Sequence, residues 1–76
     1  MTKITGLTRY NVLAIEEVFS EHIADGSIKI THTTAVFDCP AQEALDAVTG
    51  AMSKLPTRGH PRASLHAVAR KLAAQR

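Results

Sequence analysis

The chain has 76 residues, of which 45% are hydrophobic and 21% are charged, and its formal net charge is +2. This is the composition of an ordinary folded globule, and the length allows one hydrophobic core, so we expect a single domain over residues 1–76. Cys39 is the only cysteine, which excludes a disulfide-rich scaffold. Because so short a chain buries only about 60% of the surface that its unfolded form exposes, we expect oligomerisation to add stability.

Two features of the sequence predict a cytoplasmic protein. No strongly apolar run approaches the roughly 20 residues needed to cross a bilayer, and the first residues lack the apolar core of a signal peptide. A single free cysteine also fits a reducing compartment.

Acidic and basic residues are separated along the chain. Residues 1–50 hold three basic and seven acidic side chains, whereas residues 51–76 hold six basic side chains and no acidic ones. Such asymmetry indicates either a nucleic-acid or phosphate partner, or attraction between the two ends of one chain or of two chains.

The first elements in chain order are a short edge strand over residues 2–5 and a helix from Thr8 to Ala24. Thr8 can accept a hydrogen bond from a free N–H of the first helical turn. Asp25 and Gly26 supply the stop, because glycine adopts the left-handed conformation that closes a helix.

From Ser27 to Phe37 the apolar residues alternate with polar ones, and β-branched residues are dense. This pattern predicts one long strand. Its backbone groups need partners, which residues 2–5, a hairpin turn near Thr33-Thr34 or the same strand of a second chain would provide. We favour the second chain, and therefore a homodimer.

Two helices complete a predicted α+β fold of helix, long strand and two helices. The first runs from Pro40 to Leu55, with Cys39 as its N-cap, and its apolar residues form a narrow stripe typical of pairing with another helix. The second runs from Pro61 towards the C-terminus. The predicted core of the whole domain consists of Ile15, Phe19, Ile30, Val36, Leu45, Val48, Met52, Leu65 and Leu72.

Nothing in the sequence predicts a metal, a cofactor or a catalytic centre. The histidines and Cys39 lack the spacing of a zinc site, and there is no glycine-rich phosphate loop or nucleophile motif. Cys39 is the best candidate for a reactive thiol, but Asp38 beside it favours the neutral form. An enzyme with a reactive cysteine is therefore our third hypothesis, after two kinds of binding protein.

Basic residues near the C-terminus are the strongest candidates for a binding site. Arg62, His66 and Arg70 are each four residues apart on the last helix, so they share one stripe, and Arg58 lies in the loop before it. This stripe suits an acidic protein partner or a phosphate backbone. A solvated face, or pairing with the acidic first helix, also explains it.

Residues 27–76 read as strand, helix, turn, helix, and in this order they resemble the ribbon-helix-helix family. The resemblance implies a dimer that lays its paired strands in the DNA major groove, with Lys29, Thr31 and Thr33 facing the bases. The chain departs from that pattern by its preceding helix, its long strand and its two loop prolines.

The abundance of alanine and the preference for arginine in the C-terminal half resemble small proteins encoded by phages of high-GC actinobacteria. That resemblance implies a host or virion protein as the partner. Our leading hypothesis is a small, non-enzymatic binding protein that acts through protein–protein contacts. A DNA-binding protein of the ribbon-helix-helix type is the alternative.

Overall fold

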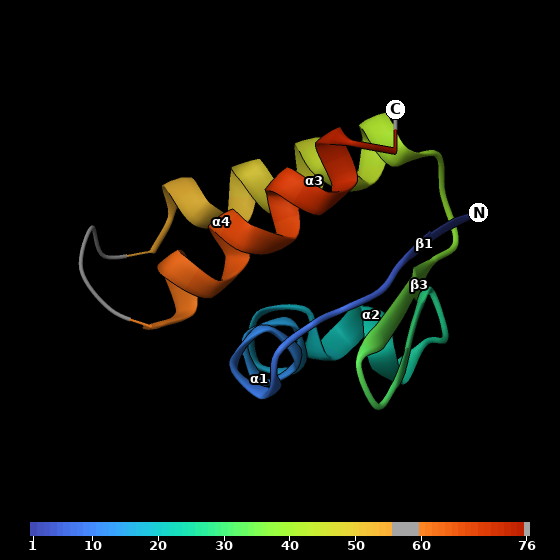
Figure 1. Ribbon diagram of the computed structural model, residues 1–76, viewed down its shortest axis with the longest axis horizontal. Coiled ribbons are helices and arrows are strands. Elements are labelled where there is room, and N and C mark those ends of the chain that lie inside the picture. Colours follow the sequence, from blue (N-terminus) through green and yellow to red (C-terminus); the bar gives the residue numbers. More distant parts are fainter. Residues whose placement is uncertain (56–59, 76) are drawn as a thin grey trace.

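The computed structural model describes residues 1–55 and 60–75. Its fold is α+β, with helices packed on one face of a small antiparallel sheet (Figure 1). The strands and helices, in chain order, are β1 (Thr2–Ile4), α1 (Arg9–Val18), α2 (Ser20–Ala24), β2 (Ile28–Thr31), β3 (Thr34–Phe37), α3 (Ala41–Ser53) and α4 (His60–Ala73).

The expected long strand is a hairpin, so that prediction was wrong. β2 and β3 pair antiparallel around a tight turn at His32 and Thr33, where His32 has a φ of 50°. β1 pairs with the other edge of β3, which gives the sheet order β1-β3-β2. The strand pairing that suggested a dimer is therefore satisfied within one chain.

The hairpin changes which residues share a face of the sheet. Ile28 lies opposite Phe37 and Ile30 opposite Ala35, so these four side chains point towards the helices. Val36, expected in the core, lies on the other face and is only half-buried.

The expected first helix is two helices that meet at Phe19. Thr8 caps α1 as predicted: the Asn11 N–H donates to the Thr8 hydroxyl at 3.2 Å, and the Thr8 N–H donates to the Asn11 side chain at 3.0 Å. Phe19 leaves the helical conformation with a φ of −113° and a ψ of 35°. Its ring is buried, whereas His22 in α2 is exposed.

Helix α3 begins one residue later than expected. Its N-cap is Pro40, not Cys39, and the Pro40 side chain makes no capping hydrogen bond. Helix α4 packs against both α3 and α1, and Figure 1 shows α3 and α4 side by side.

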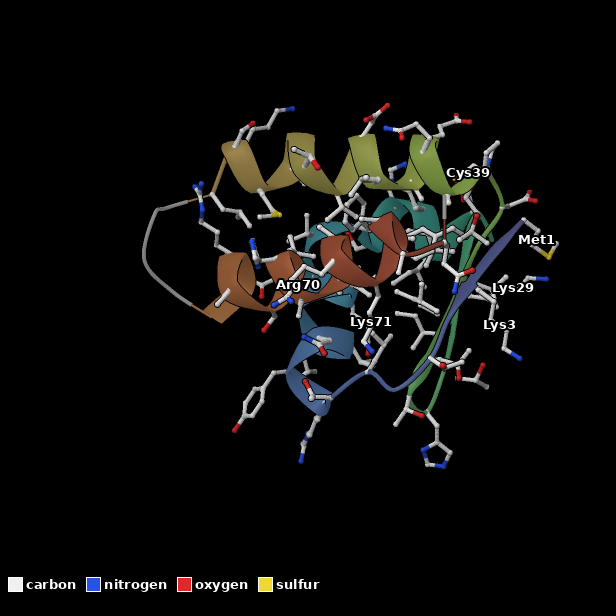
Figure 2. All side chains as sticks on the ribbon, turned by 45° about the horizontal axis from the view of Figure 1, so that its top comes forward. Met1, Lys3, Lys29, Cys39, Arg70 and Lys71 are labelled. Carbon is white, nitrogen blue, oxygen red and sulfur yellow. The ribbon has the colours of Figure 1, made fainter. Side chains whose placement is uncertain are left out.

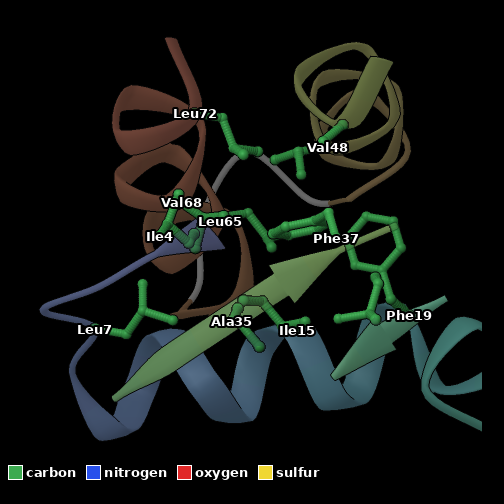
Figure 3. Packing of buried hydrophobic residues seen from close by; sticks show 13 residues of the cluster. Ile4, Leu7, Ile15, Phe19, Ala35, Phe37, Val48, Leu65, Val68 and Leu72 are labelled. Carbon is green, nitrogen blue, oxygen red and sulfur yellow. The ribbon is translucent and has the colours of Figure 1, made fainter. Parts of the chain in front are cut away.

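One hydrophobic core joins the sheet to the helices (Figure 3). Leu65, Val68 and Leu72 of α4 are each 0% exposed, as are Ile15 of α1 and Val48 of α3. The other predicted core residues that pack against this cluster while only half-buried are Ile30, Leu45 and Met52. The sheet's inner face and three helices are thus held by the same buried side chains, and the outer face of the sheet is left open.

Candidate functional site

The residues of the basic stripe on α4 have two different roles: one makes hydrogen bonds within the fold, and others are exposed at the surface. The Arg62 guanidinium donates to the backbone carbonyls of Met52 at 3.2 Å and Leu55 at 3.3 Å. Met52 lies in the last turn of α3 and Leu55 lies just beyond its C-terminus, where the helix dipole favours a cation. Arg62 therefore joins the two helices through one of its guanidinium nitrogens.

The other members of the stripe have different places. His66 and Arg70 are exposed on α4, and Figure 2 shows the position of Arg70. Arg58 lies outside the described residues. Of the four predicted stripe residues, the structure thus places two on the open surface of one helix.

A second basic surface lies on the sheet face that points away from the helices of residues 1–55 and 60–75. Lys3 of β1 and Lys29 of β2 both lie opposite Val36 of β3, so the three residues form one row across the sheet. Neighbouring strands are about 4.8 Å apart, which places the two lysine Cα atoms roughly 10 Å from one another. Both lysine side chains are exposed and extend away from the helices (Figure 2).

Two residues further along the strands, the next pair of side chains on this face carries hydroxyl groups. Thr31 lies opposite Thr34, and Thr31 is exposed while Thr34 is half-buried. We call Lys3, Lys29, Thr31, Thr34 and Val36 together the outer sheet face. Thr33, which was expected beside Lys29 and Thr31, instead lies in the hairpin turn, where its carbonyl accepts a hydrogen bond from the Leu7 N–H at 3.0 Å.

A shallow hollow of about 260 Å³ opens on the outer sheet face. Lys29, Thr31 and Val36 line it together with the carboxylate-bearing Asp38 and the exposed Met1. The hollow therefore combines cationic, anionic, hydroxyl-bearing and apolar residues. Such a mixture suits a polypeptide better than a uniformly negative backbone.

Cys39 lies at a second hollow of about 180 Å³, which His22 and Glu43 also line and which adjoins the first at Ser27 and Asp38. The thiol is half-buried, and burial first, then the nearby Glu43 carboxylate, raises the pKa of Cys39 above its ordinary value. The thiol is therefore protonated at neutral pH and is a poor nucleophile. The hydroxyl of Thr2 donates to the Cys39 carbonyl at 2.8 Å, so the backbone here ties β1 to the start of α3.

Within residues 1–55 and 60–75, no three His, Cys, Asp or Glu side chains are placed to hold a metal ion. His22 lies on α2, His32 in the hairpin turn and His66 on α4. No helix among these residues has the length and apolarity to span a bilayer.

Sequence reasoning missed Lys3 and Thr34 as surface partners of Lys29. The signal for Lys3 was present, because Thr2 and Ile4 are buried and Lys3 between them is exposed. What the sequence did not show was that β1 pairs with β3, which brings Lys3 and Lys29 to either side of one valine. No protein-family model, curated protein or solved structure matches the chain.

Proposed function

We propose that this protein is a non-enzymatic binding protein that holds an acidic protein partner against its outer sheet face. The observation that carries the proposal is the row of Lys3, Val36 and Lys29 on a sheet face left open by the helices. An apolar centre with a charged rim is the usual arrangement of a protein–protein interface.

The charge of this face explains why an acidic partner is preferred. The two lysine ammonium groups lie on either side of Val36, and Asp38 is the acidic side chain that lines the adjoining hollow. Exposed cations of this kind chiefly accelerate and orient the encounter with an acidic surface, and they add less to the final affinity.

Duplex DNA is the second candidate for the same face. The observation that favours it is that Lys29 and Thr31 point outwards together with Lys3 and Thr34. Small antiparallel sheets and ribbons can enter the major groove, where lysine and threonine contact phosphates and base edges. Asp38 opposes this interpretation, because a carboxylate beside a phosphate backbone is repelled.

Fluorescence anisotropy with two labelled probes, polyglutamate and a duplex DNA of mixed sequence, tests both candidates. Each probe is titrated with the protein at low and at physiological salt. We expect the polyglutamate to bind at low salt and Lys3→Ala/Lys29→Ala to weaken that binding by about tenfold. If neither polyanion binds at low salt, the outer sheet face is not an anion-binding surface.

Two comparisons make the result specific. Arg9→Ala removes an exposed cation from the start of α1, outside the outer sheet face, and should leave binding within about twofold of the unsubstituted protein. If DNA is the partner, Lys29→Ala should reduce the slope of log affinity against log salt by about 1, the value for the loss of one phosphate contact. If Arg70→Ala weakens polyglutamate binding and Lys3→Ala/Lys29→Ala does not, the interaction belongs to α4.

A further inference from the structure

A groove runs along α3, meets the hollow of the outer sheet face at Ser27 and Asp38, and extends away from Lys29. The hollow beside Cys39 adjoins another of about 420 Å³, and both are lined by Phe19, His22 and Ala47. The two hollows therefore form one continuous depression, with the end of α1 and α2 on one side and α3 on the other.

The α3 wall of this groove is one face of the helix. Glu43, Ala47, Gly50, Ala51 and Lys54 line it, and their spacings of four, three, one and three residues place them along one side. Ala47 and Gly50 are exposed, and a Cβ atom added to Gly50 would meet nothing within 4 Å. Small side chains here allow another helix to approach the α3 backbone closely.

The charges at the two ends of this face are opposite. Glu43 lies four residues before Ala47, and Lys54 lies four residues after Gly50. An antiparallel copy of the same helix that sets Ala47 against the partner's Gly50 must therefore set Glu43 against the partner's Lys54. By the two-fold symmetry of such a pair, the same two contacts occur twice.

We propose that this groove is the interface of a homodimer in which α3 of one chain lies antiparallel to α3 of its partner. The face is complementary to itself in charge, which a groove shaped for an unrelated helix need not be. Dimerisation would also add buried surface to a chain of only 76 residues. The outer sheet face cannot serve as a two-fold interface so readily, because two copies would bring the Lys3 and Lys29 ammonium groups together.

Charge reversal tests the pairing directly, with sedimentation equilibrium as the measurement. The unsubstituted protein should show a mass of twice 8.2 kDa at high concentration and dissociate on dilution. Glu43→Lys and Lys54→Glu should each weaken the dimer by about tenfold or more, because each turns two attractive contacts into repulsive ones. Circular dichroism of each variant establishes that it is folded.

Two rescue experiments complete the test. An equimolar mixture of the two variants should associate, because one chain then carries lysine at both positions and the other carries glutamate at both. The double variant Glu43→Lys/Lys54→Glu should regain the original affinity, because its two charges are simply exchanged. In Gly50→Leu the added Cβ meets nothing within 4 Å in the single chain, and we expect the side chain to fill the groove and abolish the dimer while the chain stays folded.

A mass of one chain at every concentration would overturn the proposal and leave the groove to another partner. If neither charge reversal changes the affinity of the dimer, the interface lies on a different surface. These outcomes are independent of polyanion binding, so the proposed function and the proposed dimer can fail separately.

Discussion

Arg62 has a structural role that its place in a basic stripe did not indicate. Its guanidinium bonds the carbonyls of Met52 and Leu55, so Arg62→Ala should lower the free energy of unfolding by about 1–2 kcal/mol. Arg70→Ala removes the same kind of side chain from an exposed position on α4 and should change it by less than about 0.5 kcal/mol. Urea denaturation of both variants measures the difference. Equal values would mean that the Arg62 hydrogen bonds do not stabilise the fold.

Cys39 gives a prediction about pH. Burial and the Glu43 carboxylate raise the pKa of its thiol, so the folded chain holds this proton more tightly than the unfolded chain does. The resulting contribution to stability is present below the unfolded pKa and is lost as the pH rises through the folded pKa. Iodoacetamide should therefore alkylate the folded protein more slowly than the urea-unfolded chain at about pH 8, where an unperturbed thiol is partly ionised. An equal or faster rate in the folded protein would contradict the raised pKa.

Asn11 is a residue whose role the sequence could not show. Its backbone and side chain complete the capping box with Thr8, and its side-chain amide also donates to the Ser64 carbonyl in α4 at 3.1 Å. The cap itself is a local pattern that a threonine at the helix start predicts. The bond to α4 joins residues 53 positions apart, and no local pattern contains it.

Among the elements, the helices were easier to predict than the strands. Apolar residues that recur every 3.6 positions predicted α4 and its buried leucines, because a single apolar helix face is enough to define this pattern. The hairpin was one of the alternatives but was not favoured, because neither Gly nor Pro marks its turn and the alternation continues through it. That error placed Val36 in the core and hid the pairing of Lys29 with Lys3 across β3. Two of the five residues of the outer sheet face, Lys29 and Thr31, were therefore predicted from the sequence, and the other three required the topology.

The turn between β2 and β3 contains a residue in an unusual backbone conformation, and this gives a prediction about stability. His32 adopts a φ of 50°, in the left-handed region that residues other than Gly adopt uncommonly and β-branched residues hardly at all. His32→Asn should raise the free energy of unfolding by about 0.5 kcal/mol, because asparagine tolerates this conformation better. Thermal denaturation should show a higher midpoint. His32→Val, which favours the extended conformation, should lower it, and the opposite order would mean that the turn is not under strain.

The whole molecule depends on one core that every large element shares. α4 contributes Leu65, Val68 and Leu72, all fully buried, and it packs against both α1 and α3. A chain of 76 residues has a total stability of about 4–11 kcal/mol at typical values per residue. Removing a single large side chain from α4 should thus weaken the sheet and the helices together.

Leu65→Ala and Leu13→Ala test how far the stability depends on the shared core, because they make the same chemical change at a buried and at an exposed position. Leu65 is 0% exposed, so its truncation should cost about 2–5 kcal/mol through lost burial and the cavity left behind. Leu13 is 48% exposed on α1, and its truncation should cost less than about 1 kcal/mol. Urea denaturation followed by circular dichroism measures both. Hydrogen exchange should show the amides of β3 and α4 losing protection together in Leu65→Ala, because both rest on the same core. Loss of protection in α4 alone would mean that the sheet and α1 form a separate stable unit.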